Sequence, residues 1–272
     1  MKKISLIFSC IFLIACAKKE TSLVAPSIDY GAYKPKQIIH STRNYSGSTV
    51  TYSLDTLAFT YKGSNISYVL KRNGRVNNDY NVVLENGIYT EVFSQKGVLS
   101  PQKIYYRLNA SGLIDSTWLT SNDKITQGGS YKYNADGTKD FELYNYTNYI
   151  NTKKYSYKNE TAVQAIIERI SYLPSIPPAK DSVVFEYTTL PYRADFSING
   201  MPISRYGKPE KYLIKKATYY NKLDNNALRQ TYEYSYQTNE IGLTSKKIMN
   251  IYTQPGNVLL LTDTIAYSYQ IP

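Results

Sequence analysis

The sequence predicts an all-β protein, an antiparallel meander that forms a curved open sheet or half-barrel with at most one or two short helices. Two pairs, Asn73-Gly74 and Asn86-Gly87, are flanked by strand-like runs. They indicate type I′ hairpin turns, because such turns need positive φ at both central residues. Tyrosines also recur two residues apart, as at Tyr155 and Tyr157, which is the spacing of side chains on one face of a strand.

The predicted strands follow one another as hairpins. The two Asn-Gly turns separate strands expected over residues 66–72, 75–85 and 88–93. Further turns are expected at Asn109-Ala110-Ser111-Gly112 and at Asn134-Ala135-Asp136-Gly137, each between two strand-like runs. The pattern is therefore that of a meander.

One strand motif occurs three times, at residues 55–61, 181–187 and 263–269. It reads Asp, hydroxyl residue, aliphatic residue, Ala or Val, aromatic residue, any residue, Tyr. We expect the Asp to hydrogen-bond the backbone two residues on and so to start the strand. Strand alternation places the aliphatic, aromatic and tyrosine positions on one face.

Residues 161–173 fit two structures. Thr161 and Gln164 form a possible capping box, and the apolar residues that follow have helical spacing. The same residues could form one arm of a hairpin through residues 174–180, and we favour this strand because strands surround it. The segment 191–211, rich in Pro and Gly, is expected to be a long loop with one short helical turn.

Tyrosine must contribute to the interior. The chain has 30 Tyr but only 7 Phe and 1 Trp, and its hydrophobic fraction of 42% includes those tyrosines. Without them the apolar fraction falls below that of an ordinary globular domain. Tyr combines a large rigid surface with a polar tip, so a tyrosine-rich sheet face could either pack a core or bind a ligand.

The N-terminus predicts export. Lys2 and Lys3 precede an apolar run over residues 4–14, shorter than the roughly 20 residues that span a bilayer as a helix. The run ends in Leu13-Ile14-Ala15-Cys16, which resembles the lipobox of bacterial lipoproteins. The resemblance implies a signal peptide over residues 1–15 and acylation of Cys16, with palmitate among its chains. An ordinary signal with an incidental Cys is the alternative.

Residues 16–32 are expected to be a flexible tether, followed by a single β-rich domain over residues 33–272. Lipoproteins of this kind in Gram-negative bacteria usually lie in the outer membrane, and Ala17 is not the Asp that retains some of them at the inner membrane. The run Ala17-Lys18-Lys19-Glu20 lacks the acidic start that marks surface export in some lineages. The sequence therefore favours the periplasmic face over the cell surface.

The formal net charge of +11 comes from scattered Lys and Arg residues. A diffuse positive surface is attracted to anionic membranes. Since the chain is exported, we expect the membrane, and not a nucleic acid, as its partner.

Few residues are suited to catalysis or metal binding. His40 is the one His, and Cys10 leaves with the signal peptide. A Ser-His-Asp or Cys-His site would have to use His40, for which we expect a structural or exposed role. No catalytic residue, metal site or cofactor is predicted. A hydrolase of the glycosidase type stays open as a weaker alternative, because it needs only two carboxylates about 5–10 Å apart.

Four tripeptides resemble the Asp-Ser/Thr acceptor of periplasmic O-glycosylation in some Gram-negative lineages. The acceptor hydroxyls would be Thr56, Ser116, Ser182 and Thr264, each directly after an Asp. Three of them belong to the repeated strand motif, so a purely structural origin is the alternative. Sugar mass beyond the acyl chains in the intact native protein would distinguish the two.

Three segments, 131–138, 206–214 and 232–243, look like elements of a family of uncharacterised, Tyr-rich, YD-repeat-like lipoproteins of Gram-negative bacteria. The resemblance implies a meander or curved open sheet and supplies no catalytic residue.

We therefore expect a non-enzymatic, monomeric, lipid-anchored envelope protein. Its Tyr-lined sheet face would bind an extended ligand, such as a glycan, peptide or lipid, or another envelope protein. The candidate contacts are Trp118, Tyr144 and Tyr146. A structural or assembly lipoprotein without a small ligand is the alternative.

Overall fold

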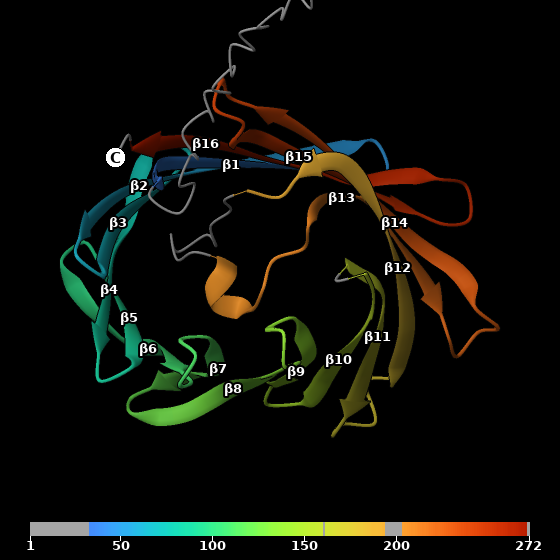
Figure 1. The fold of residues 1–272 in the computed structure, drawn as a ribbon, viewed down its shortest axis with the longest axis horizontal. Coiled ribbons are helices and arrows are strands. Elements are labelled where there is room, and N and C mark those ends of the chain that lie inside the picture. The colour runs from blue at the N-terminus through green and yellow to red at the C-terminus, as the bar shows by residue number, and fades with distance from the viewer. Residues whose placement is uncertain (1–32, 160, 194–202, 271–272) are drawn as a thin grey trace, which may run out of the picture.

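The protein forms a closed antiparallel β-barrel, shown in Figure 1. The computed structural model describes residues 33–159, 161–193 and 203–270. Each strand pairs with its neighbours in the chain, and the first strand also pairs with the last. The all-β class and the antiparallel meander are confirmed, but the expected open sheet or half-barrel is wrong.

The barrel consists of strands that follow one another in chain order, with a single turn of 3-10 helix before the thirteenth. Their bounds are β1 Lys34–Ser46, β2 Thr49–Lys62, β3 Asn65–Arg72, β4 Arg75–Glu85, β5 Ile88–Gln95, β6 Val98–Leu108, β7 Ile114–Ser121, β8 Lys124–Tyr133, β9 Lys139–Asn145, β10 Tyr149–Lys158, β11 Thr161–Ser171, β12 Ala179–Pro191, η2 Ile203–Tyr206, β13 Tyr212–Asn221, β14 Ala227–Thr238, β15 Thr244–Thr253 and β16 Val258–Gln270.

Closure occurs where β1 pairs with β16, for example His40 with Ile265 and Asn44 with Leu261. Closing a sheet removes its two edges and so pairs backbone N–H and C=O groups that an open sheet would expose. The hairpin pattern in the sequence is the same for an open and a closed meander, which is why it did not predict the contact between the first and last strands.

The predicted hairpin turns are confirmed. Asn73 and Gly74 have φ of 49° and 81°, and Asn86 and Gly87 have φ of 49° and 76°, as a type I′ turn requires. In the two longer turns, Gly112 N donates to Asn109 O and Gly137 N donates to Asn134 O, both at 2.9 Å.

Residues 161–171 form β11, so the preferred strand is confirmed over the helix. Ala162 pairs with Tyr157 and Gln164 pairs with Ser156, which leaves Val163 without a partner in β10. Such a β-bulge shifts the alternation by one residue. Ala162 and Ala165 are consequently both buried, and their spacing of three residues also fits a helix.

The helical turn η2 lies within the predicted loop and inside the outline of the barrel in Figure 1, and residues 194–202 of that loop lie outside the described part. We call the end of the barrel where β1 starts and β16 ends the terminal end. Arg205 Nη1 donates to Gly112 O at 2.9 Å, and Lys208 N donates to Gly137 O at 2.7 Å. These bonds hold η2 against the β6–β7 and β8–β9 turns. Within the described ranges, no helix is long and apolar enough to cross a membrane.

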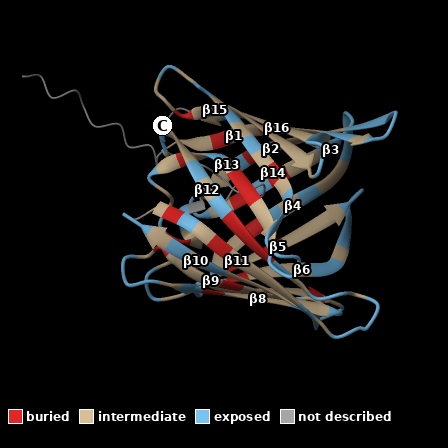
Figure 2. Cartoon of the chain, turned by 90° about the vertical axis from the view of Figure 1, so that its right-hand side faces the viewer, coloured by how far each residue is buried: buried red, intermediate tan, exposed pale blue. Residues whose placement is uncertain are grey.

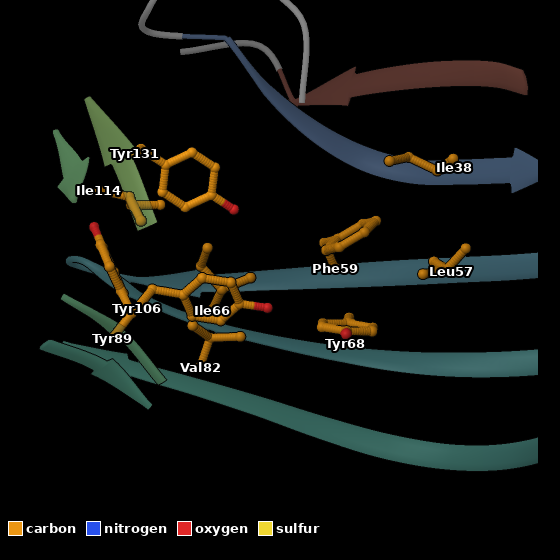
Figure 3. Close-up of a cluster of buried hydrophobic side chains, with 10 residues drawn as sticks. All are labelled: Ile38, Leu57, Phe59, Ile66, Tyr68, Val82, Tyr89, Tyr106, Ile114 and Tyr131. Carbon is orange, nitrogen blue, oxygen red and sulfur yellow. The ribbon is translucent and has the colours of Figure 1, made fainter. Parts of the chain in front are cut away.

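The main core lies inside the barrel against β1 to β8. Figure 3 shows its side chains, which point from these strands toward one another. Its buried members are Ile38, Leu57, Phe59, Ile66, Tyr68, Val82, Tyr89, Tyr106, Ile114 and Tyr131. Tyr206 of η2 also packs against this cluster, with its ring edge-to-face on Tyr131 at 5.8 Å between centroids.

Candidate functional site

The two faces of the barrel wall differ in chemistry. The core residues identify the inner face, and strand register assigns their partners to the same face, as with Tyr68 and Tyr80. Alternate residues therefore point outward. The inner face carries most strand tyrosines, including the Tyr-x-Tyr steps at 155/157 and 232/234/236, while the hairpin tips are mostly exposed (Figure 2).

The outer face is polar. Its register rows carry charged side chains on β3, β4, β6, β8 and β10 to β15: Lys71, Asp79, Lys103, Arg107, Lys132, Lys154, Glu168, Lys180, Glu186, Lys216, Glu233 and Lys246. A barrel that crosses a membrane instead needs an apolar band about 25 Å tall on its outer wall, because a charge at the bilayer midplane costs about 2–4 kcal/mol. An outer wall with these charged side chains is therefore suited to contact with water.

Tyrosines at the terminal end tie neighbouring strands together. Each lies near the end of an even-numbered strand and donates its hydroxyl to a carbonyl near the start of the strand before it. The bonds are Tyr133 to Ile114 at 2.5 Å, Tyr157 to Lys139 at 2.7 Å, Tyr187 to Ala162 at 2.7 Å, Tyr236 to Ile214 at 2.8 Å and Tyr269 to Thr244 at 2.7 Å. The last tyrosine of the steps 131/133, 155/157, 232/234/236 and 267/269 therefore has a structural role that spacing alone did not reveal.

A buried carboxylate, Glu142, organises the inner wall of β9 and β10. Its Oε1 accepts from Lys139 Nζ at 2.6 Å and from the Tyr155 hydroxyl at 2.9 Å, and its Oε2 accepts from the Tyr144 hydroxyl at 3.4 Å. Burial raises the pKa of Glu142, but Lys139 and Lys153 with these hydrogen bonds outweigh burial and hold it below its ordinary value. Glu142 is thus an ionised acid inside the barrel.

A second buried carboxylate, Glu91, lies between two core tyrosines. Tyr68 donates to its Oε1, and Tyr106 donates to its Oε2 at 2.8 Å. Burial, followed by the charge of Glu91, raises the pKa of Tyr68 far above its ordinary value. Both glutamates therefore use their oxygens to orient aromatic rings.

His40 lies on the inner face and pairs with Asp263 of β16. His40 Nε2 is 2.5 Å from Asp263 Oδ1, and the Thr42 hydroxyl donates to the same oxygen at 2.8 Å. Thr42 Oγ1 is also 3.4 Å from the same His40 Nε2. In a catalytic triad the acid contacts one ring nitrogen of the His and the nucleophile contacts the other. Here Asp263 and Thr42 both approach Nε2, so this arrangement is not a triad. The expected structural role of His40 agrees with this pairing.

The pairing predicts a pH dependence. The hydrogen bond to Asp263 raises the pKa of His40, against burial that lowers it. When the pKa of a His is higher in the folded than in the unfolded protein, its contribution to stability is complete below the unfolded-state pKa of about 6.5. That contribution is lost as the pH rises through the folded-state pKa. Between pH 6 and 9 we expect the free energy of unfolding to fall by about 1.5 kcal/mol relative to His40→Gln. Urea titrations at each pH measure this, and a difference that does not change with pH would contradict it.

The repeated strand motif has a different cause from the expected one. Asp55, Asp181 and Asp263 lie within β2, β12 and β16 and do not start these strands. Each pairs with a cation of another strand: Asp55 with Arg72 at 2.9 Å, Asp181 with Arg229 at 2.7 Å and Asp263 with His40. The Asp of the motif therefore forms ion pairs between strands. Its partners come from other strands, so a local turn motif could not predict them.

Thr56, Ser182 and Thr264 alternate with these inward Asp residues and so lie on the outer wall, and Ser116 lies there because it pairs with the outward Arg107. Thr56, Ser116 and Thr264 are half-buried there. Ser182 is only 3% exposed and accepts from Gln164 Nε2 at 2.9 Å. Glycosylation stays a prediction, and Ser182 is the acceptor least open to an enzyme.

The three candidate aromatics line one cavity of about 180 Å³ beside the β7–β9 wall, together with Ile104, Thr117, Leu119, Gln127, Gly128 and Asn145. Tyr144 and Tyr146 belong to the inner face. Trp118 belongs to the outer face, where its ring stacks on Tyr105 at 5.1 Å between centroids. The structure thus brings two of the three rings together inside the barrel.

Glycine keeps this part of the wall open. A Cβ on Gly129 would lie 2.8 Å from Thr117 Oγ1 and 3.4 Å from the Tyr144 ring. A larger side chain at this position would therefore displace the ring that lines the cavity.

A larger cavity of about 610 Å³ lies at the terminal end and is lined by Tyr33, Thr238, Asn239, Glu240, Ile241, Ser245, Tyr267, Ser268 and Tyr269. A third, of about 160 Å³, lies between η2 and the inner wall and is lined by Lys139, Tyr155, Tyr157, Tyr192 and residues 206–210. The sequence did not single out either cavity. Among the described residues, no three His, Cys, Asp or Glu side chains form a metal site.

No protein-family model matches the chain, and no curated protein matches its sequence. Two solved structures resemble it in fold. A porin-like protein from Bacteroides uniformis ATCC 8492 is 12% identical with a TM-score of 0.54, over 87% of this chain and 96% of the other. A porin-like protein from Bacteroides vulgatus ATCC 8482 is 11% identical with a TM-score of 0.50, over 85% and 98%. At these identities the likeness concerns the fold alone, and the resemblance to YD-repeat-like lipoproteins stays a prediction.

Proposed function

We propose that this protein is a non-enzymatic, lipid-anchored component of the outer membrane whose barrel lies in water and binds an extended ligand inside. The observation that carries the proposal is the distribution of side chains over the wall, with most strand tyrosines inside and charged side chains on most strands outside. A barrel suited to water needs another means of membrane attachment, which acylated Cys16 would supply. Similarity in fold to two porin-like proteins is compatible with an envelope location.

The chain direction supports an orientation. Cys16 precedes β1 by fewer than 20 residues, and β1 starts at the terminal end. An extended chain spans at most about 3.5 Å per residue, so the tether reaches about 60 Å at most, and the terminal end is the end of the barrel to which the anchor attaches. In this proposal the opposite end, with the turns at residues 73–74 and 254–257, faces away from the membrane, and the run Ala17-Lys18-Lys19-Glu20 favours the periplasmic side.

The ligand surface in this proposal is the tyrosine-lined interior. Tyr144 and Tyr146 line the 180 Å³ cavity, and Tyr146 packs on Tyr149 with 4.7 Å between ring centroids. A tyrosine ring has a polar hydroxyl and only two rotatable side-chain bonds. It can therefore bind extended ligands such as sugars and peptides with little loss of side-chain entropy. Tyr146 also lies directly after β9, where a ligand could reach it.

Photo-crosslinking in cells tests the proposal. We expect a benzoylphenylalanine in place of Tyr146 to form an adduct of defined extra mass in the membrane fraction. The same residue in place of Tyr220, which pairs with outward Ser182, is the matched control and should form none. Cys16→Ser, run in parallel, should move the protein out of the membrane fraction.

Two outcomes would overturn parts of this proposal separately. Equal adducts at Tyr146 and Tyr220, or none at Tyr146, would exclude an interior ligand. Retention of Cys16→Ser in the membrane fraction would exclude the lipid anchor.

A further inference from the structure

Two cations lie next to each other on the inner wall. Lys153 of β10 pairs with Ile167 of β11, and Arg169 of β11 pairs with Asn151 of β10. Lys153 and Arg169 are therefore diagonal neighbours on one face, about 7–8 Å apart at the backbone. Both side chains are half-buried, so solvent still reaches them from the interior of the barrel.

The nearby acids already have cations of their own. Glu142 accepts from Lys139 at 2.6 Å, and Asp181 accepts from Arg229 through Oδ2 at 2.7 Å, while its Oδ1 is buried without a hydrogen-bond donor. Lys153 and Arg169 make no ion pair with a described residue, and Arg169 Nε is buried without a hydrogen-bond acceptor. Glu142 lies directly opposite Lys153 in the register and compensates part of its charge without forming an ion pair with it, whereas Arg169 keeps a buried N–H donor without an acceptor.

Aromatic rings hold the two cations in place. Lys153 Nζ lies 4.6 Å from the centroid of the Tyr155 ring and 5.9 Å from that of Phe185. Arg169 Cζ lies 5.9 Å from the Tyr149 ring centroid. Cation–π contacts orient a charge but satisfy none of the three N–H donors of Lys or the five of Arg. Burial lowers the pKa of Lys153, as expected for a cation without a full set of acceptors.

An apolar surface adjoins the cations. Ala165, Val183 and Ala217 form a second buried cluster, and Ile167 and Phe185 pack against it. Ile167 lies directly opposite Lys153. The inner wall thus offers N–H donors and apolar contact within one side-chain length of each other.

We propose that Lys153 and Arg169 bind the acidic group of an amphiphile, a carboxylate or phosphate attached to an apolar chain or ring, whose apolar part lies along Ile167 and Phe185. The proposal rests on the interior ligand site proposed above and adds its chemical class. An anionic oxygen accepts from both side chains and supplies the missing hydrogen bonds, which are stronger for charged partners. The Glu142 oxygens already accept from Lys139, Tyr155 and Tyr144, so the ligand and not Glu142 would supply the hydrogen-bond acceptor of Lys153.

Calorimetric titration tests the chemical class on the Cys16→Ser chain, which keeps acyl chains from competing for the probe. The probes are dodecanoate and dodecyl phosphate, below their micelle concentrations, and dodecanol, below its solubility limit. We expect both anions to bind at least about tenfold more tightly than the alcohol. Lys153→Met and Arg169→Gln should each weaken the anions by about tenfold and leave the alcohol unchanged. A difference between the two anions identifies the preferred acidic group.

Lys154→Met is the matched control. Lys154 is exposed and pairs with Phe141 on the outer face, so its replacement removes the same charge from the neighbouring position and should not change binding. Equal binding of anions and alcohol, or anion binding that neither inward variant weakens, would overturn the cation site. Absence of binding by all three probes would overturn the amphiphile class, while the adduct from position 146 decides separately whether the interior has a ligand.

Discussion

Replacing Glu142 with alanine is expected to lower the free energy of unfolding by about 3–5 kcal/mol. The substitution leaves Lys139 inside the barrel without its carboxylate and removes the acceptor of the Tyr155 hydroxyl. Breaking a buried pair by removing one partner costs this much because the remaining charge stays buried and uncompensated. The Glu142 side chain is 9% exposed and that of Lys139 is 22% exposed, so water compensates little.

The pH dependence of this contribution has a definite sign. The pKa of Glu142 lies below its ordinary value in the folded protein. Its stabilisation is therefore present above the unfolded pKa of about 4.3 and is lost as pH falls through the folded value. The difference between the wild-type protein and Glu142→Ala should consequently shrink below about pH 4.

Urea unfolding of Glu142→Ala, with Glu233→Ala as the control, measures the effect. Glu233 forms an ion pair with Lys216 at 3.7 Å, and its side chain is 50% exposed. Exposed pairs contribute about 0–1 kcal/mol, so the control should change stability little. A loss in Glu142→Ala no larger than in Glu233→Ala would contradict the assignment of Glu142 to a buried ion pair.

Replacing Ile38 with alanine is expected to cost about 2–5 kcal/mol, whereas Ile39→Ala should cost far less. Ile38 is 1% exposed and belongs to the main core, and Ile39 is 38% exposed. A fully buried Ile loses its transfer free energy and leaves a cavity when it is truncated. The two substitutions are adjacent and chemically identical, so their difference measures burial alone.

This pair also tests barrel closure. Ile38 pairs with Leu57 of β2 and with Tyr267 of β16, so both neighbours cover it only in a closed barrel. Urea unfolding of the two variants gives the comparison. Equal losses at positions 38 and 39 would indicate that β1 is an open edge and would contradict the closed fold.

Several features could be predicted because they depend on neighbours in the chain. The turns at Asn73-Gly74 and Asn86-Gly87 follow from the positive φ that these residues tolerate. The common face of Leu57 and Phe59 follows from strand alternation, and both belong to the core. Tyr144 and Tyr146 share a cavity for the same reason.

The site residues that sequence reasoning missed depend on long-range partners. The local sequence does not distinguish Glu142 from the other acids. Its burial follows from the pairing of β9 with β10, in which it lies opposite Lys153. Lys153 and Arg169 lie 16 positions apart, and the bulge at Val163 sets which of the β11 residues face inward with them. No pattern in the local sequence predicts such a shift of register.

The sequence by itself determined the class of the protein: antiparallel strands, their turns, and a face on which tyrosines supplement the aliphatic core residues. Tertiary structure decided that the sheet closes and that this face is the inner one. The physical reason is the range of the interactions. Turn conformation and alternation depend on residues a few positions apart, whereas closure requires residues 34–44 of β1 to pair with residues 261–270 of β16.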